Sequence, residues 1–186
     1  MVLPVCVYGN PVLRKKAEPI GYDYPDLEKI LADLWETMYV ADGVGLAAPQ
    51  LGFSIRIFVI DTKEMADEDE TIPRFKRAFI NPVMVSPPEG EEWVMKEGCL
   101  SIPGFREEVK RPSIVKLKWQ DENFKPFEES LDGMVARVIQ HEYDHLEGIL
   151  FPDRLTPLKR RLVKGRLTSI SKGFFEADYR TVPNRK

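Results

Sequence analysis

Residues 131–148, LDGMVARVIQHEYDHLEG, indicate both the central element of the fold and where the chemistry lies. Apolar side chains recur here at the i, i+3, i+4, i+7, i+8 spacing of one helix face: Leu131, Met134, Val135, Val138 and Ile139. Continuing the same count reaches Glu142 and His145, and Gly148 follows as a helix stop. The pattern therefore predicts an amphipathic helix that carries polar residues toward its buried face.

His141 and His145 are the only histidines in the chain, and they lie four residues apart. On a helix this spacing brings both imidazoles to one face, within reach of a single cation. Glu142 is then aimed beside the cation, where a base for a bound water belongs. A helix with two core histidines is the plain alternative, but the added glutamate on a buried face favours metal-assisted hydrolysis.

Two imidazoles do not complete a metal site, because a third protein ligand is needed beside an open position for water. Metalloproteases with the pattern H-E-x-x-H-x-x-G-x-x-H supply a third histidine, but that position is Phe151 here, although Gly148 matches. Glu147 is too close along the chain, and Glu176 lies in a basic tail. The remaining soft ligand is Cys99, in the stretch Glu97-Gly98-Cys99-Leu100-Ser101.

A glycine-rich stretch, GVGLAAPQ at 43–50, could belong to a phosphate loop. Phosphate loops follow a strand and precede a helix. Here the order is reversed, because a predicted helix over 25–41 comes first and the β-branched run 55–60 follows. A plain helix-to-strand connection remains open. Alternatively, the glycines allow close backbone approach and, with the amide of Gln50, suit an oxyanion-binding wall.

The composition bounds the class of protein. The 186 residues include 27 Lys plus Arg and 30 Asp plus Glu, a formal net charge of −3. This length predicts one domain over 1–186, with 171–186 as a flexible basic tail. No apolar stretch is long enough for a membrane helix. Two cysteines cannot form a disulfide framework, so a reducing cytosol fits, with Cys6 a buried structural thiol. The mildly acidic balance argues against coating of nucleic acid.

The order of the expected elements predicts the fold class. Strands are expected near 55–60, 77–85, 92–96, 104–110, 113–120 and 124–130, and helices over 25–41, 131–146 and 157–170. The strands cluster between the first two helices. We therefore expect an α+β fold, with antiparallel-rich sheets wrapped around a central metal-binding helix and with an N-terminal and a C-terminal helix. The acidic stretch 63–71 is expected to be a solvated surface insertion.

Three separated motifs, GVGLAAPQ at 43–50, EGCLS at 97–101 and QHEYDH at 140–145, together resemble those of peptide deformylases. The resemblance extends over about residues 4–167. It implies a metallohydrolase that removes the formyl group from the N-terminal formyl-methionine of nascent chains and releases formate. It also implies one divalent metal, Fe²⁺, with Zn²⁺, Ni²⁺ or Co²⁺ able to substitute, held by Cys99, His141 and His145.

The same resemblance assigns catalytic roles. Glu142 acts as general base and then as general acid for a metal-bound water that attacks the formyl carbon. The side-chain amide of Gln50 and the backbone N–H of Leu100 stabilise the oxyanion, and Gly45 belongs to the same catalytic set. The pocket for the substrate is implied to be lined by Val44, Met95, Glu97, Arg106, Met134, Arg137 and Val138.

Two charged residues beside the motif need partners of their own. Arg137 stands where many family members carry an apolar residue. An unpaired buried guanidinium would be costly, so it either extends to the pocket rim or pairs with an acid. We expect the rim arrangement, with the charge facing the peptide beyond the methionine. For Asp144, a solvated acid and a pair with Arg111 that holds the metal helix against the sheet are both open.

Two other functions remain open from the sequence. One is an endopeptidase of the zincin type, against which the missing ligand downstream of His145 counts. The other is an inactive ribosome- or protein-binding module, against which the complete set of ligands and Glu142 counts. The expected partners are N-formyl-methionyl nascent peptides and the ribosome, with no membrane and no DNA. The absence of an Arg/Ser-rich leader favours a bacterial cytoplasmic enzyme over an organellar precursor.

Overall fold

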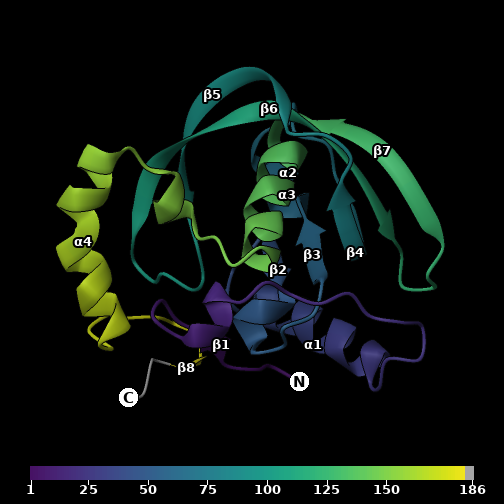
Figure 1. Ribbon diagram of the computed structural model, residues 1–186, viewed down its shortest axis with the longest axis horizontal. Coiled ribbons are helices and arrows are strands. Elements are labelled where there is room, and N and C mark those ends of the chain that lie inside the picture. Colours follow the sequence, from purple (N-terminus) through teal and green to yellow (C-terminus); the bar gives the residue numbers. More distant parts are fainter. Residues whose placement is uncertain (183–186) are drawn as a thin grey trace.

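The computed structural model describes residues 1–182 and has an α+β fold (Figure 1). Its main sheet has the strand order β2-β3-β4-β6-β5, and β7 pairs with β6 outside this path. Every pairing in this sheet is antiparallel. The strands are β2 (Gly45–Ala47), β3 (Ile57–Asp61), β4 (Lys76–Met84), β5 (Glu89–Gly98), β6 (Arg106–Gln120) and β7 (Pro126–Asp132).

The helix that bears the two histidines lies at the centre of the molecule. It is α3 (Gly133–Leu146), and in Figure 1 the strands β5, β6 and β7 arch around it. The other helices are α1 (Leu27–Val40), the short α2 (Lys63–Glu68) and α4 (Pro157–Ser171). The expected α+β class, central helix and terminal helices are confirmed. Within residues 1–182, no helix is both long and apolar enough to cross a membrane.

One expectation about the strands is wrong. The two strands expected at 104–110 and 113–120 are a single strand, β6, which runs through Pro112. Its first part pairs with β5, and its last part pairs with β4 and β7. Pro112 carries no N–H for a ladder, but its carbonyl accepts a hydrogen bond from Gln140 Nε2 of α3 at 2.9 Å. The strand continues through the proline, and the carbonyl of Pro112 links β6 to the helix.

The acidic stretch 63–71 is mostly exposed, as expected of a surface insertion, but the sequence did not predict that α2 forms within it. Ala66 is buried, so this side of α2 packs against the rest of the protein. The exposed carboxylate of Asp67 pairs with Arg74.

Three apolar clusters hold the elements together. The first lies between α1 and β2–β3, and includes Leu34, Met38 and Ile57. The second lies between α3 and the strands β3, β4 and β6, and includes Phe58, Phe79 and Ile139. The third joins β6 to the chain around α4. α3 therefore has a buried apolar side against the sheet, as its apolar stripe predicts.

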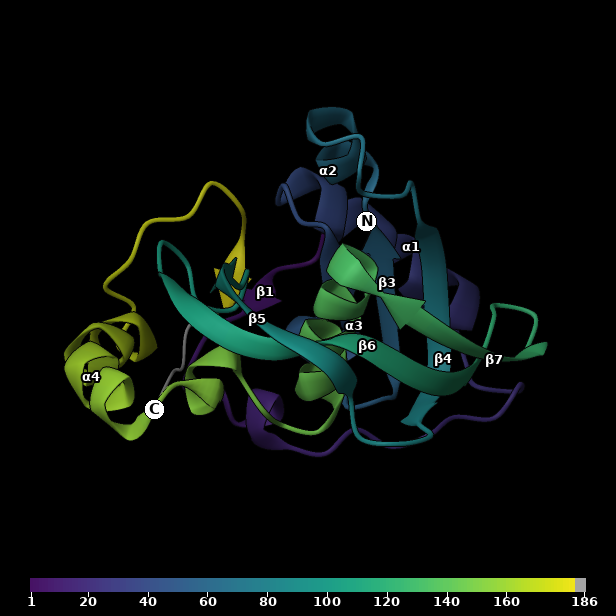
Figure 2. The same cartoon turned by 90° about the horizontal axis from the view of Figure 1, so that it is seen from above.

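Two short strands join the ends of the described chain. β1 (Val5–Cys6) pairs in parallel with β8 (Thr181–Val182). Part of the segment expected to be a flexible tail, 171–182, therefore returns to the body of the molecule (Figure 2). Residues 183–186 of that expected tail lie outside the described residues.

Candidate metal centre and active site

Three donor atoms from two parts of the fold meet beside α3. His141 and His145 project from consecutive turns of the helix, and Cys99 follows directly after the end of β5. The ligand atoms of these three residues all lie within 4.8 Å of one another. Cys99 Sγ lies 3.3 Å from His145 Nε2. A thiolate and two imidazoles at this separation are a donor set for a divalent transition metal, with a position left open for water.

The surroundings act differently on the two imidazoles: burial opposes charge on His141, but hydrogen bonds to Cys99 and Glu97 outweigh it and raise the pKa of His141 well above its ordinary value, so this ring would give up a proton on binding a metal. His141 Nδ1 lies 3.1 Å from Glu97 Oε2, so an N–H there donates to the carboxylate and leaves Nε2 to bind a cation. His145 is 1% exposed, and burial lowers its pKa well below the ordinary value, so its ring is neutral. A neutral imidazole has a lone pair for a metal, which a charged one lacks. The residues present therefore fit the metal that the motifs imply.

Glu142 lies beside the three ligands without a salt bridge of its own among the described residues. Burial raises the pKa of its carboxyl to about 7, and Oε2 is buried with no hydrogen-bond partner among residues 1–182. A Cβ atom at position 45 would lie only 2.6 Å from Glu142 Oε1. Gly45 therefore leaves the room in which the carboxylate sits. A carboxyl with such a pKa can both accept and return a proton near neutral pH.

The side chain of Gln50 is fixed in one orientation. Its Oε1 accepts a hydrogen bond from the backbone N–H of Ala47 at 2.9 Å, so its Nε2 faces the metal ligands. That Nε2 lies 3.2 Å from Ser101 Oγ and 3.6 Å from Cys99 Sγ. Leu100 stands in the turn between these two residues, which is closed by the N–H of Ile102 donating to Cys99 O at 2.8 Å. The side-chain amide of Gln50 and the turn that contains Leu100 thus both lie next to the metal ligand Cys99.

A cavity of about 800 Å³, lined by Cys99 and His141 among others, opens beside the candidate ligands and is large enough for a methionine side chain and part of a peptide. Every residue expected around the substrate lines it: Val44, Met95, Glu97, Arg106, Met134, Arg137 and Val138. Other lining residues were not expected from the sequence, among them Asp42, Met65, Asp178 and Tyr179. Asp178 and Tyr179 come from the C-terminal segment, which contains no motif that could have pointed to them.

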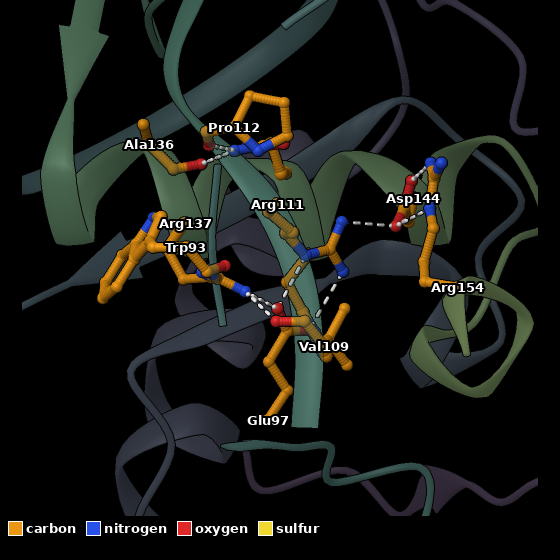
Figure 3. Close-up of polar contacts among 11 residues, drawn as sticks. Trp93, Glu97, Val109, Arg111, Pro112, Ala136, Arg137, Asp144 and Arg154 are labelled. Carbon is orange, nitrogen blue, oxygen red and sulfur yellow. Dashed lines mark hydrogen bonds and ion pairs between the residues drawn. The ribbon is translucent and has the colours of Figure 1, made fainter. Parts of the chain in front are cut away.

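Glu97 is the centre of a buried ion-pair network (Figure 3). Arg111 donates to it twice, from Nε at 2.6 Å and from Nη2 at 2.9 Å. Burial opposes the charge of Glu97, but the bonds from His141 and Arg111 outweigh it and lower the pKa of the carboxyl well below its ordinary value. Arg111 also donates from Nη1 to Asp144 Oδ2 at 2.8 Å, and Arg154 completes the pairing of Asp144. Of the two arrangements that the sequence left open for Asp144, the structure has the pair with Arg111 and not the solvated acid.

The rim arrangement expected for Arg137 is wrong. Its side chain is 3% exposed, and its Nη1 donates to Glu97 Oε1 at 2.8 Å and to Val109 O at 3.0 Å. Its Nη2 donates to Trp93 O at 2.7 Å, and the guanidinium lies over the Trp93 ring, 4.4 Å from the centroid (Figure 3). The alternative from the sequence was that Arg137 pairs with an acid. This alternative is correct, because Glu97, near the end of β5, faces α3 and pairs with Arg137.

The other carboxylates considered as ligands lie elsewhere. Glu147 pairs with Arg56 at 2.8 Å and with Lys16 at 3.1 Å, and Glu176 is exposed in the C-terminal segment. Cys6 is buried at 6% exposure, as expected of a structural thiol. The fold and the site together have the features of a class, the metal-dependent hydrolases: three converging donor atoms from Cys99, His141 and His145, the buried carboxyl of Glu142 beside them, and a peptide-sized cavity.

Comparison with known proteins gives the family. A model of the polypeptide deformylase family matches residues 2–161. A peptide deformylase of Christiangramia forsetii is 48% identical over 194 residues, which cover 100% of this chain and 98% of the relative. One of Cytophaga hutchinsonii is 51% identical over 180 residues, which cover 97% and 96%. The crystal structure of peptide deformylase from Thermus thermophilus has a TM-score of 0.80 and 40% identity, and covers 93% of this chain and 99% of that one.

The chain belongs to the polypeptide deformylase family. It is a metallohydrolase that removes the formyl group of nascent polypeptides, as the three sequence motifs imply. The alternatives of a zincin endopeptidase and of an inactive binding module are not supported by the family match.

Proposed function

We propose that this chain deformylates N-formyl-methionyl peptides with Glu142 as the base and with Cys99, His141 and His145 as the ligands of one divalent metal. The observation that supports this most directly is the buried, unpaired oxygen of Glu142, which has no partner among residues 1–182, beside three converging donor atoms. A metal held there supplies Lewis acidity, which makes a water a nucleophile near neutral pH. We propose Fe²⁺ as the metal, with Zn²⁺, Ni²⁺ or Co²⁺ able to substitute.

The residues of the chain divide the chemistry among them. Glu142 accepts a proton from the attacking water, whose oxygen adds to the formyl carbon. Gln50 Nε2 and the N–H of Leu100 donate to the formyl oxygen as it gains negative charge, which lowers the barrier. Glu142 then returns its proton to the methionine nitrogen, the C–N bond breaks, and formate and a free amine leave. Gly45 leaves space for the carboxylate throughout.

The substrate side chain is proposed to enter the cavity between α3 and the glycine-rich stretch. Val44, Met134 and Val138 give its wall an apolar character, and Met95 faces it from β5. Arg106 stands at the wall formed by the start of β6, where the peptide beyond methionine would pass. Because Glu97 and Arg137 pair with each other, we propose that they shape this wall rather than bind the peptide charge.

The setting of the enzyme is also a proposal. The residues that line the site come from stretches between 40 and 179, so we propose one catalytic domain over the whole chain. Nascent formyl-peptides emerge at the ribosome, which is therefore the proposed place of action. The curated relatives named above are bacterial, and both cysteines are free thiols, which supports a bacterial cytoplasm.

A single assay tests the proposed activity. The protein is purified without oxygen, its metal content is measured by mass spectrometry, and formate release from formyl-Met-Ala-Ser is compared with cleavage of the unformylated peptide. We expect formate release and no cleavage of the unformylated peptide. No formate from an iron- or nickel-loaded sample would exclude the proposal, and cleavage of the unformylated peptide would favour an endopeptidase.

The role of Glu142 is tested by Glu142→Gln, which removes the proton carrier but none of the ligands. We expect the metal content to stay and kcat to fall by at least about a thousandfold, roughly 4 kcal/mol of barrier. Glu128→Gln on the exposed face of β7 is the matched control and should leave kcat unchanged. A Glu142→Gln rate within about tenfold of the wild type, roughly 1.4 kcal/mol, would show that Glu142 is not the base.

A further inference from the structure

The segment that follows α4 forms one wall of the active-site cavity. It returns to the body of the molecule (yellow in Figure 2), where β8 pairs with β1. The N–H of Val5 donates to Arg180 O at 2.9 Å, and the N–H of Val7 donates to Val182 O at 3.1 Å. These bonds hold Asp178 and Tyr179 at the cavity, which both residues line. The family model matches only residues 2–161, so this wall lies beyond the part of the chain that the match covers.

Tyr179 contacts the turn that carries the metal ligand Cys99. Its hydroxyl donates a hydrogen bond to the carbonyl of Leu100 at 2.7 Å. Its ring packs, partly buried, against the apolar cluster between α1 and β2–β3, and the side chain of Leu100 packs against the same cluster. The phenol is therefore held from two sides, by apolar contact on the ring and by a hydrogen bond at the tip.

Both central residues of the turn, Leu100 and Ser101, are anchored by hydrogen bonds from other parts of the chain. Ser101 is held by the N–H of Tyr8, which donates to Ser101 O at 2.8 Å, and by Gln50 Nε2 at Ser101 Oγ. Leu100 is held at its carbonyl, which among the described residues accepts a hydrogen bond from the hydroxyl of Tyr179. The carbonyl of Leu100 belongs to the peptide group that joins it to Ser101, and its N–H belongs to the peptide group that joins it to Cys99. Both groups meet at the Cα of Leu100, so a hydrogen bond at the carbonyl restrains this residue from the side opposite its N–H.

We propose that Tyr179 is a positioning residue for the deformylation reaction: by anchoring Leu100 at its carbonyl, it restrains the turn through Cys99 and Leu100 and so keeps the N–H of Leu100 directed at the formyl oxygen. This inference rests on the proposed role of Leu100 as an oxyanion donor. An oxyanion donor must be placed before the charge develops, because a donor that reorganises during the reaction contributes less. The C-terminal segment is thereby part of the catalytic apparatus, although it contains no catalytic motif.

A purely structural role makes a different prediction from a positioning role. If the hydroxyl only satisfies a carbonyl, its loss lowers the melting temperature and leaves the kinetics of the folded enzyme unchanged. If it positions Leu100, its loss weakens a contact that is made in the transition state and not in the ground state. Such a loss lowers kcat and leaves KM unchanged.

The test is Tyr179→Phe in the nickel-loaded enzyme, since this change removes the hydroxyl and keeps the ring. We expect kcat on formyl-Met-Ala-Ser to fall about tenfold, while KM and the Kd of the product Met-Ala-Ser stay within twofold and the metal content does not change. Tyr24→Phe is the matched control, because Tyr24 also packs against the cluster between α1 and β2–β3 but does not line the cavity. It should leave kcat unchanged.

The outcomes separate this inference from the proposed function. The wild-type rate in the same assay tests the function by itself. If the wild type turns over and Tyr179→Phe has a kcat within twofold of it, the positioning role is overturned, whatever happens to the melting temperature. A tenfold rise in KM and in the Kd of Met-Ala-Ser, with kcat unchanged, would also overturn the positioning role. Such a result would mean that the hydroxyl contributes to peptide binding in the ground state.

Discussion

Helix α3 meets the rest of the molecule through two contrasting faces. On one face, Val135, Ile139 and Leu146 pack into the apolar cluster shared with β3, β4 and β6. On the other, Arg137 and Asp144 face a network of buried charges supplied by β5 and β6 (Figure 3). Both faces are buried to a similar degree. The apolar face is held by the burial of nonpolar surface, which has no preferred direction, whereas the charged face is held by ion pairs and hydrogen bonds of fixed geometry.

The difference shows which face sets the position of the metal ligands. An apolar contact tolerates a small rotation of the helix, because it depends on buried area more than on angle. The charged face does not, since Glu97 is bound at once by His141, Arg111 and Arg137. Removing one partner from such a network leaves a buried charge unpaired, which costs far more than the pair contributes. We therefore expect the apolar face to determine folding and the charged face to determine the orientation of His141.

The largest expected effect comes from Glu97→Gln, which removes the charge at the centre of the network. In this variant Arg111 still has Asp144 as a charged partner, but Arg137 has only backbone carbonyls and the Trp93 ring as partners. We expect the free energy of unfolding to fall by about 3–5 kcal/mol. We also expect metal affinity to fall by about 10- to 100-fold, because His141 loses the carboxylate that orients it. Chemical denaturation and competition with a metal chelator measure the two quantities.

Glu92→Gln is the control for that change, because Glu92 lies on the same strand and pairs with Lys110 at the surface. An exposed pair contributes less than about 1 kcal/mol, so its unfolding and metal affinity should stay near those of the wild type. Equal effects of the two substitutions would mean that the buried network has no special role.

A smaller effect is expected from Asp144→Asn. Asp144 accepts bonds from Arg111 and Arg154 on its two oxygens, and the amide keeps only one oxygen as acceptor while its NH2 group faces a guanidinium donor. We expect the free energy of unfolding to fall by about 1–3 kcal/mol, the cost of leaving a buried donor poorly paired. Metal affinity should fall less than in Glu97→Gln, because Asp144 does not contact a histidine ring directly. Thermal melting and metal titration check this, with exposed Asp132→Asn as the control. Unchanged melting would mean that the pair with Arg111 adds nothing to stability.

The apolar face was predictable from the sequence, and so was most of the fold. The spacing of Val135, Val138 and Ile139 places one helix face in the core whatever the rest of the chain does. The α+β class followed from the order of the elements. The continuity of β6 through Pro112 did not, because a proline is compatible with a strand only when its neighbours tolerate the missing N–H, and those neighbours are remote in sequence.

The candidate site was predictable where residue types are rare and spacing is short. His141, Glu142 and His145 share one helix, and Cys99 was the remaining soft ligand. The partner of Arg137 was not predictable, because pairing with Glu97 depends on where β5 ends relative to α3. Tyr179 lies outside every motif, and its contact with Leu100 depends on the return of the C-terminal segment to β1. Contacts of long sequence separation without a distinctive residue pattern leave no trace in a single sequence.

The smallest expected effect tests the apolar face by itself. Ile139→Val removes one methylene from a residue that is 0% exposed in the cluster between α3 and the sheet. We expect a loss of about 0.5–1.5 kcal/mol in the free energy of unfolding, from lost burial and a small cavity. Metal affinity and kcat should both stay within twofold, because the charged face keeps its geometry and with it the direction of His141. If metal affinity instead falls tenfold, as expected for Glu97→Gln, the two faces are coupled and the orientation of the ligands depends on core packing as well.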